Sequence, residues 1–364
     1  MRKNKNNETD LPLTISSKDG LVDQISFFNK TVASKDMSGY YLLMNGEYAY
    51  NKSYSVGYDF GSIKRLERYP MGALSTLYIC FALKKYNSDF IKTYFDSLKW
   101  YKEIYMISAE GARNHGLLNV PTDEFFDTYH YLTNNVAEQS KIATLMGLVE
   151  QRIEKQQALV DNLKKYKRGM IRSIFSDISS WKEYSISNVG TVITGNTPPT
   201  QNPDNYMGDR LFCAPGDLGH SKYIASTEKN ISETALNKNR KIPKGSILVT
   251  CIGSTIGKMG IAGEEMLTNQ QINSVIVSKD HCNEFVYYTL EYYFPQFISH
   301  VGKQAVPILS KDQFENLRIS LPSIEVQRNY SSILASFDIK IEKAAELLQH
   351  LQKYKSGLLQ QLFI

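Results

Sequence analysis

Residues 253–258, with the sequence GSTIGK, are the part of the chain that most resembles a catalytic motif. In a phosphate-binding loop, glycine backbone groups cradle the phosphates, a Lys reaches the terminal phosphate, and a Ser or Thr holds magnesium. Here the two glycines are one residue too close together, and Met259 stands where the hydroxyl side chain should follow. We therefore predict a turn with a basic tip and not a nucleotide site.

The other residue types that commonly do chemistry are scattered. The six His show no metal-ligand spacing, and the four Cys form no C-x-x-C pair. No G-x-G-x-x-G loop follows a predicted strand, and residues 196–199 (NTPP) depart from the NPPY loop of amino-methyltransferases, because a Thr intervenes and no aromatic residue follows. The sequence thus predicts no catalytic residue, no metal and no cofactor. Scattered cysteines also fit a reducing cytoplasm.

Polar loops rich in Lys, Arg, Asn and Gln are the remaining candidates. Arg and Lys match guanine edges and phosphates, whereas Asn and Gln match adenine edges. Any one such loop is more often an ordinary solvated turn, but their occurrence in both halves of the chain favours nucleic acid. The candidate DNA-contacting residues are Lys52, Tyr54, Lys64, Arg65, Arg113, Asn114 and His115 in the first half and Asn196, Thr197, Lys222, Tyr223, Lys238, Arg240, Thr255, Lys258, Gln270, Gln271, Lys303 and Gln304 in the second.

Two long predicted helices, residues 138–175 and 326–363, must position these loops. In each, apolar residues recur at alternating steps of three and four, which is the seam of a coiled coil. The two segments align at one fixed offset, and even a polar seam position recurs, Lys167 with Lys355. The repeat predicts that the helices bury their apolar stripes against each other. The alternative is two unrelated amphipathic helices in one core.

The order along the chain is globular segment, long helix, globular segment, long helix. We expect domains at residues 1–137 and 179–325, a central helix and hinge at 138–178, and a C-terminal helix at 326–364. Local patterns predict a strand over 74–83 and a helix over 89–105 in the first domain. In the second they predict strands over 271–278 and 314–322 and a helix over 283–298. The first domain lacks a segment matching residues 181–199.

Composition is typical of a soluble globular protein, with 42% hydrophobic and 22% charged residues. A net charge of +5 is compatible with nucleic acid without being diagnostic. No apolar run approaches membrane-spanning length, and the polar opening residues 1–10 are not typical of a signal peptide. We therefore expect a cytoplasmic protein.

A set of motifs resembles the specificity subunit of Type I restriction–modification systems. The motifs are residues 45–54 (NGEYAYNKSY), 195–200 (GNTPPT), 244–261 (KGSILVTCIGSTIGKMGI), 269–273 (NQQIN) and 321–327 (LPSIEVQ). The resemblance covers nearly the whole chain except the opening of the first domain. It implies a mixed α/β (α+β) fold, in which two similar target-recognition domains are joined by a pair of long antiparallel coiled-coil helices with internal pseudo-two-fold symmetry.

The resemblance also implies a function. Each target-recognition domain would read one half of a bipartite, asymmetric DNA site, and the helix pair would set the spacing. Two methyltransferase subunits would dock on the chain, and restriction (translocase) subunits would join them. S-adenosylmethionine, ATP and magnesium are expected only in those partners, and no membrane partner is expected. Tandem repeats agree, because they offer two equivalent faces to two copies of one partner.

Two alternatives stay open. The chain could be the recognition module of a fused or self-sufficient nuclease or methyltransferase, or a coiled-coil scaffold that binds only protein. On the leading interpretation, Arg113 and His115 in the first domain and Lys303 and Gln304 in the second occupy equivalent places, because both pairs lie in predicted turns before matching Asp-x-Phe segments.

Overall fold

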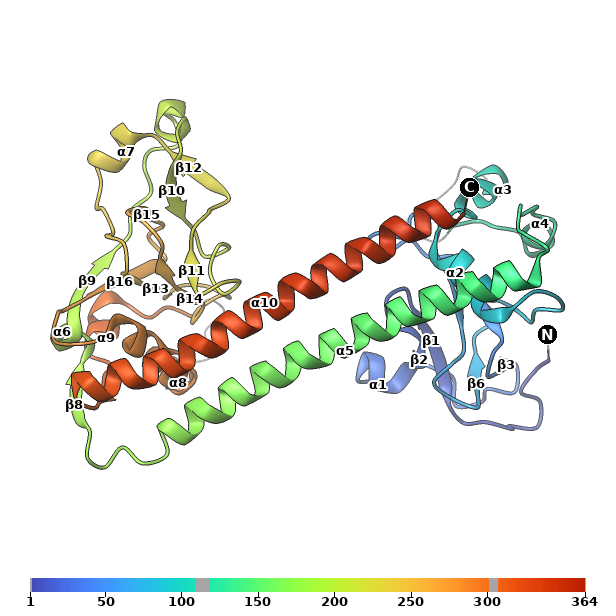
Figure 1. Cartoon of the computed structure of the whole chain (residues 1–364), viewed down its shortest axis with the longest axis horizontal. Helices are drawn as coiled ribbons and strands as arrows, with labels where there is room; N and C mark the ends of the chain where they lie inside the picture. Colours follow the sequence, from blue (N-terminus) through green and yellow to red (C-terminus); the bar gives the residue numbers. More distant parts are fainter. Residues whose placement is uncertain (1, 109–117, 301–306, 364) are drawn as a thin grey trace. The chain divides into compact units, whose positions relative to one another are not determined.

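The computed structural model describes residues 2–108, 118–300 and 307–363. The chain divides into two compact units (Figure 1). Unit 1 consists of Met1–Gln157 and Glu346–Ile364, and unit 2 of Ala158–Ala345. Each unit therefore contains one globular part together with half of each long helix. None of the helices in the described ranges is long and apolar enough to cross a membrane.

The two long helices are α5 (Val136–Ile174) and α10 (Ile324–Leu362), each of 39 residues. The two bounds of α10 follow those of α5 by the same interval, which is also the offset of the sequence repeat. The predicted helices and their repeat are thus confirmed to within two residues at each end. In unit 1, Met146 of α5 and Leu359 of α10 belong to one core cluster, and in unit 2 Ile171 of α5 and Leu334 of α10 belong to another. The start of α5 therefore lies with the end of α10, so the pair is antiparallel.

Unit 2 is built on a five-stranded sheet whose central strand is fully buried. The strand order is β11 (Tyr223–Ile224), β14 (Met259–Ala262), β13 (Ile247–Thr250), β16 (Ile272–Val277) and β9 (Gly190–Thr194). Helices α6 (Ile186–Val189), α8 (Asn283–His300) and α9 (Lys311–Glu315) share one apolar cluster with this sheet and with both long helices. A two-stranded ribbon, β8 (Lys182–Ser185) with β17 (Arg318–Leu321), closes the same cluster. A second layer contains η1 (Pro203–Tyr206), β12 (Lys229–Ile231), β10 (Arg210–Cys213), β15 (Leu267–Thr268) and α7 (Glu233–Asn237).

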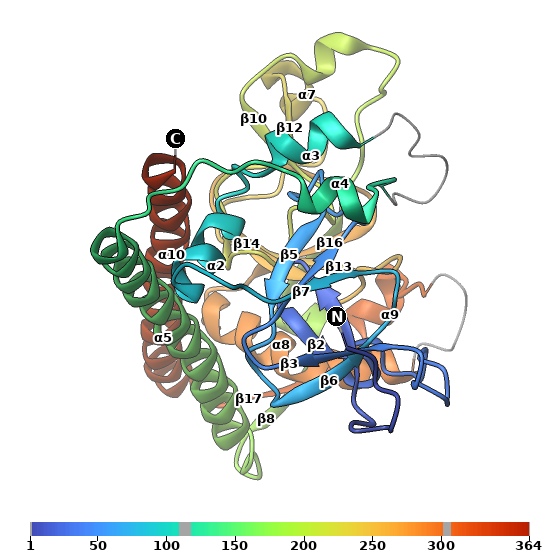
Figure 2. The ribbon, with the colours of Figure 1, turned by 90° about the vertical axis from the view of Figure 1, so that its right-hand side faces the viewer.

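In its described residues, unit 1 repeats this plan with fewer strands. One sheet has the order β5 (Ser62–Arg65), β4 (Tyr48–Asn51), β7 (Ile79–Phe81). The other has the order β2 (Gly20–Asp23), β1 (Pro12–Ser16), β6 (Met71–Leu74), β3 (Tyr41–Met44). Its described residues also form the helices α1 (Gln24–Phe28), α2 (Ser88–Asp96), α3 (Tyr101–Ile107) and α4 (Thr122–Phe126). Helix α2 lies between the first sheet and the two long helices (Figure 2), and its Phe90 contacts Phe363.

The correspondence between the units extends to the pairing of individual strands. Central strands β4 and β13 both follow a glycine with positive φ, Gly46 at 86° and Gly245 at 84°. In the second layer β1 pairs parallel with β6 and antiparallel with β2, as β10 pairs parallel with β15 and antiparallel with β12. The internal repeat predicted from the helices therefore includes the globular parts.

A buried glutamine fixes each globular part to its long helix. Gln139 and Gln327, which correspond in the helix repeat, are 2% and 1% exposed. The side-chain oxygens accept hydrogen bonds from the backbone N–H groups of Asn87 and Cys282, both at 2.9 Å. These groups stand at the starts of α2 and α8, where backbone donors lack partners within the helix.

Three local predictions were wrong. Residues 74–83 are not one strand, because the chain turns after Leu74 and passes from the sheet of β6 to that of β7. The predicted helix over 89–105 is broken into α2 and α3 at Leu98, whose φ of 61° is left-handed. Phe314 belongs to α9, which a capping box of Ser310 and Gln313 begins, so the strand predicted over 314–322 covers only Arg318–Leu321.

Candidate nucleic-acid interface

Three loops of unit 2 meet beyond the end of β9. They are residues 195–200 after β9, residues 238–241 after α7 and residues 269–271 between β15 and β16. The side-chain amide of Asn196 donates to Asn239, and its oxygen accepts from the backbone N–H of Arg240 at 3.3 Å. The hydroxyl of Thr197 donates to the side-chain oxygen of Gln270. We call these side chains the amide cluster: Asn196, Thr197, Asn239, Arg240, Asn269 and Gln270.

The strand register explains why the loops meet. β9 and β16 are antiparallel, with Thr194 opposite Asn273, so the end of one strand lies beside the start of the other. Gly195 connects the strand to its loop, and its N–H donates to Ile272 at 3.0 Å. A Cβ atom at this position would lie 2.2 Å from the carbonyl oxygen of Thr268. The glycine is therefore required by close backbone approach.

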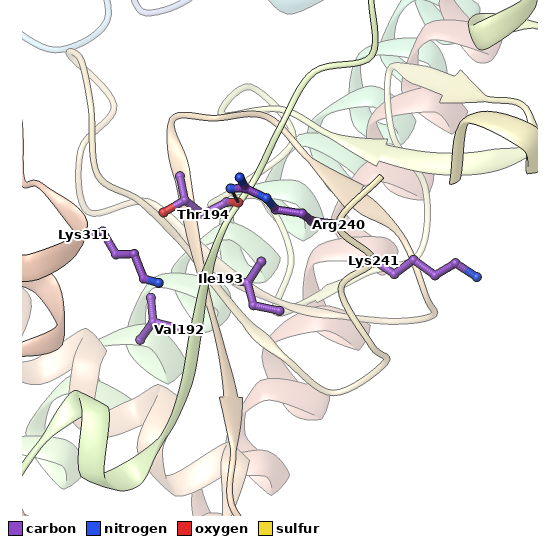
Figure 3. A pocket seen from close by; sticks show the side chains of 6 residues that line it. All are labelled: Val192, Ile193, Thr194, Arg240, Lys241 and Lys311. Atoms are coloured by element: carbon purple, nitrogen blue, oxygen red, sulfur yellow. Dashed lines mark hydrogen bonds between the residues drawn. The ribbon is translucent and has the colours of Figure 1, made fainter. Parts of the chain in front are cut away.

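A hollow lined partly by cations adjoins the amide cluster. Its volume is about 530 Å³, and its walls are Val192, Ile193, Thr194, Arg240, Lys241 and Lys311. Figure 3 shows Lys311 on one side of the strand and Arg240 and Lys241 on the other. Arg240 donates to the carbonyl of Thr194 at 3.3 Å. Arg240 and the amides are suited to base-edge contacts, and Lys241 and Lys311 to phosphate contacts beside them. Each of these two lysines also pairs with a carboxylate, Lys241 with Glu265 and Lys311 with Glu315, both at 3.4 Å.

Residues 253–258 form a turn between β13 and β14, as predicted. Ile256 N–H donates to Gly253 at 3.1 Å, and Gly257 N–H donates back to Thr250 at 2.9 Å. A strand and not a helix follows, so the geometry of a phosphate-binding loop is absent from this segment. The side-chain amide of Gln271 donates to the carbonyl of Ile252, next to the same turn, at 3.5 Å. The aliphatic part of the Lys258 side chain packs against Gly219. Thr255 lies within the turn.

Lys222 and Tyr223, which were predicted to contact DNA, are both held by an acidic side chain of unit 2. Lys222 donates to Glu284 at 2.8 Å and to the Tyr288 hydroxyl at 2.7 Å, and the Tyr223 hydroxyl donates to Glu284. Burial raises the pKa of Tyr288, and Asp338 raises it further, so this hydroxyl stays protonated and donates to Asp338. A DNA contact by Lys222 or Tyr223 would have to replace these interactions.

In unit 1, Lys64 and Arg65 also form ion pairs within their own unit. Residues 62–65 are strand β5 and not the predicted loop. Lys64 pairs with Asp96 at 2.8 Å, and both side chains are about one-sixth exposed (15% and 16%). Arg65 pairs with Glu67 at 2.7 Å and with Asp89 at 2.6 Å.

The remaining predicted residues are more open. Lys52 and Tyr54 lie after β4, at the place that the 253–258 turn takes after β13, and Tyr54 is 56% exposed. Lys238 is the exposed residue that follows α7. Arg113, Asn114, His115, Lys303 and Gln304 lie outside the described residues. Sequence reasoning missed Lys311, because only the fold brings the first turn of α9 to β9.

Residues 178–353 match the family model described as the Type I restriction modification DNA specificity domain. The match covers the second globular part and most of the second long helix. The chain is 30% identical over 190 residues to the MjaIX Type I restriction enzyme specificity subunit of Methanocaldococcus jannaschii. The aligned residues cover 50% of this chain and 44% of that protein. It is 32% identical over 153 residues to the HindI Type I specificity subunit of Haemophilus influenzae, covering 40% and 33%. The matches thus span less than half the length of these two relatives.

Two solved structures share the fold. The S subunit of a Type I restriction–modification system from M. genitalium has a TM-score of 0.59 at 16% identity, covering 92% of this chain and 87% of that chain. A chain from a structural study of assembly and conformational transition in the type I system has a TM-score of 0.58 at 15% identity, covering 100% and 93%. These likenesses confirm the mixed α/β fold class predicted from the sequence.

Proposed function

We propose that this chain is the non-catalytic DNA-specificity subunit of a Type I restriction–modification complex. Each unit reads one half of a bipartite DNA site. The observation that carries the proposal is the duplication: two units of one plan and two long helices of 39 residues each, together with an amide cluster within the residues that match the DNA-specificity family model. The site is asymmetric because the loops of the two units differ in sequence.

The proposed partners are two methyltransferase subunits, which dock on the long helices. Apolar side chains that the helix seam leaves exposed recur at the same heptad position of both helices. They are Leu145 (41% exposed), Leu159 (46%) and Tyr166 (70%) on α5 and Ile333 (37%), Leu347 (40%) and Tyr354 (57%) on α10. Each residue of the second set follows its counterpart in the first at the offset of the helix repeat. A duplicated apolar stripe is suited to two copies of one partner.

Catalysis and its cofactors belong, on this proposal, to the partners. Methyl transfer with S-adenosylmethionine resides in the methyltransferase subunits, and ATP- and magnesium-dependent cleavage in the restriction subunits that join them. In the described ranges no three His, Cys, Asp or Glu side chains group as metal ligands do. We also propose a cytoplasmic location, which is supported by the four free cysteines.

The test is to assemble the chain with its methyltransferase and map methylated bases across a genome. The expected result is one bipartite motif with two different halves. The variant Arg240→Ala should relax the half that unit 2 reads and leave the other half intact, because a good base contact contributes about 1–3 kcal/mol of discrimination. Lys229→Ala removes an exposed cation of the same unit outside the amide cluster and should leave both halves unchanged.

Several outcomes would contradict the proposal. A complex that methylates without sequence preference would remove the specificity role. Methylation or cleavage by the extensively purified chain alone would favour the alternative of a self-sufficient enzyme. Stable assembly with the methyltransferase but no DNA binding would favour the protein scaffold. Equal relaxation of both half-sites in Arg240→Ala would show that the amide cluster does not read one half.

A further inference from the structure

The hydrogen bonds of the amide cluster form two relays, each of which begins at a backbone N–H. In the first relay, the N–H of Arg240 donates to the side-chain oxygen of Asn196. The Asn196 amide donates to Asn239, whose own amide donates to the carbonyl of Ala235 at 2.6 Å. Because a backbone N–H can only donate, it determines which end of each amide faces which neighbour. Both ends of the two side-chain amides are therefore engaged within unit 2.

The second relay ends on an exposed side chain. The N–H of Gln271 donates to the side-chain oxygen of Asn269 at 2.9 Å, so the Asn269 amide donates to the Thr197 hydroxyl, at 3.3 Å. That hydroxyl donates its own hydrogen to the side-chain oxygen of Gln270. Gln270 is exposed, whereas Asn269 and Thr197 are half-buried. Among the described residues the NH2 group of Gln270 has no acceptor. The relay thus holds the Gln270 oxygen within the loop and presents its NH2 group to solvent.

Arg240 is the other exposed side chain of the cluster with unused donors. Its guanidinium donates to the carbonyl of Thr194 at 3.3 Å (Figure 3), which is its one side-chain hydrogen bond among the described residues. A guanidinium carries several N–H donors and no acceptor. The relays attach Arg240 to Asn196 and Gln270 to Thr197, and these two are adjacent in the chain. The two sets of donors therefore lie close enough together to meet neighbouring base pairs.

We propose that these donors, the guanidinium of Arg240 and the NH2 group of Gln270, select keto bases in the half-site that unit 2 reads. Keto bases are guanine and thymine, which present the acceptors O6 and O4 in the major groove, whereas adenine and cytosine present amino donors there. Arg240 contacts O6 and N7 of a guanine, and Gln270 contacts the keto oxygen of the next base on the same strand. The inference rests on the proposed function and specifies the bases that it recognises.

The second relay excludes the base that glutamine commonly reads. Glutamine recognises adenine with both ends of its amide, because its oxygen accepts from N6 while its NH2 group donates to N7. The Thr197 hydroxyl already holds the oxygen of Gln270, so only the donating half of that contact remains. Loop composition alone would favour adenine, and the hydrogen-bond directions reverse this expectation. Asn196, Asn239 and Asn269 are then positioning residues, which orient the readers and touch no base.

Two variants of the readers test the proposal in the chain assembled with its methyltransferase. Mapping of methylated bases with Arg240→Ala should relax a G·C pair, which identifies the guanine and the strand that is read. Gln270→Glu keeps the shape of the side chain and its contact with Thr197, but turns the outer donor into an acceptor. The next base on that strand should therefore change from guanine or thymine to cytosine or adenine, with a change in preference of about tenfold or more.

The matched control is Gln201→Glu. It adds the same charge to an exposed residue of unit 2 that lies outside both relays, and it should leave the motif unchanged. The half-site read by unit 1 is an internal control in every variant.

A pair of substitutions at Thr197 tests the relay itself. Thr197→Ser keeps the hydroxyl and should keep the motif. Thr197→Val removes it and frees the Gln270 amide to turn, so adenine should become acceptable at the position that Gln270 reads. If Thr197 only maintained the fold of the loop, Thr197→Val would weaken binding to all sequences equally, and that result would overturn its role in orienting the reader.

A base analogue tests the contact with guanine. 7-Deazaguanine lacks the N7 acceptor, so placing it at the guanine that Arg240→Ala identifies should weaken binding of the unaltered complex in a gel shift by about tenfold. The Arg240→Ala complex should respond little to the same analogue. Equal binding of both DNAs by the unaltered complex would show that Arg240 does not contact this edge of the base.

The outcomes separate this inference from the proposed function. An unaltered complex that methylates without any motif would overturn both. A clear motif in which Arg240→Ala relaxes an A·T pair, or in which Gln270→Glu leaves every position as it was, would overturn the inference and leave the proposed function standing.

Discussion

Two ion pairs related by the repeat make the antiparallel register of the long helices testable. In unit 1, Glu150 of α5 lies 2.7 Å from Lys355 of α10. In unit 2, Lys167 of α5 lies 2.8 Å from Asp338 of α10. At the offset of the helix repeat, Asp338 corresponds to Glu150 and Lys355 corresponds to Lys167. Each pair thus exchanges the roles of the helices, as contacts across a two-fold axis do.

The magnitude follows from the exposure of the partners. Glu150 and Lys355 are 28% and 25% exposed, whereas Lys167 and Asp338 are 14% and 21% exposed. Exposed pairs contribute about 0.2–1 kcal/mol, and breaking a buried pair costs about 3–5 kcal/mol. Interpolating between these limits, we expect a coupling energy of about 1–2 kcal/mol for the first pair and more for the second. Lys92, at 3.2 Å from Glu150, limits the loss when Lys355 is removed.

The assay is a double-mutant cycle with Glu150→Gln and Lys355→Met, read by the opening free energies of amides in residues 346–362. Amides of residues 324–345 serve as the internal control, because they belong to the other unit. The matched cycle of Asp338→Asn and Lys167→Met should reverse the two readouts. The charge-swapped variant Glu150→Lys with Lys355→Glu should recover part of the loss. Additivity to within about 0.5 kcal/mol in both cycles would refute this explanation of the register.

The first pair also predicts a pH dependence. Burial alone would raise the pKa of Glu150, but Lys355 and Lys92 outweigh it and hold the pKa below its ordinary value of 4.5. A carboxylate with a lowered folded-state pKa stabilises the fold fully above its unfolded value. The stabilisation is lost as the pH falls through the lower, folded-state value. The Glu150→Gln variant should therefore lose less protection than the unaltered chain below pH 4.5, and equal losses would contradict the assignment.

Three further predictions concern other parts of the chain. Gln327→Leu leaves a buried backbone N–H unpaired and should lower the free energy of unfolding of unit 2 by about 1–3 kcal/mol. Gln139→Leu should have the same effect on unit 1. Chemical denaturation with unit-specific probes measures both. Gly195→Ala meets backbone at 2.2 Å and should weaken DNA binding, measured by gel shift of the assembled complex, with helical content unchanged; full binding would contradict the required close approach. Inserting one matched heptad after Ala158 and after Glu346 keeps the apolar seam and lengthens the helix pair by about 10 Å. Methylation mapping should then show a spacer between the half-sites that is longer by up to about three base pairs, at roughly 3.4 Å per pair. An active variant with an unaltered spacer would show that the helices do not set this distance.

Periodic elements could be predicted from the sequence, and connections could not. Helices α5 and α10 were located because their seams repeat over many turns. The helix predicted over 283–298 is α8, Asn283–His300. The apolar run at 74–83 hides a change of sheet, and no local pattern reveals the left-handed Leu98 that separates α2 from α3. An apolar run in the sequence indicates that a segment is buried, but it does not indicate which sheet the strand joins.

The site shows the same division. Loop composition identified Asn196, Arg240 and Gln270, which the antiparallel β9–β16 pair brings to one place. The carboxylate partners of the basic residues could not be predicted, because they are distant in the sequence. Asp96 lies 32 residues after Lys64, and Glu284 lies 62 residues after Lys222. The sequence of a loop therefore does not reveal whether its basic side chain is available to contact DNA or is already paired within the protein.

These internal partners bear on how the chain could bind DNA. It carries 42 Lys and Arg against 37 Asp and Glu, and Lys64, Arg65, Lys167, Lys222 and Lys355 form ion pairs within their own units. Phosphate contacts by free cations supply most of the sequence-independent affinity for DNA. A cation held by a carboxylate contributes less to that affinity, whereas the neutral amides of the amide cluster contribute to discrimination between bases. On the proposed function, this chain would therefore select the sequence, and much of the affinity for DNA would come from the partner subunits.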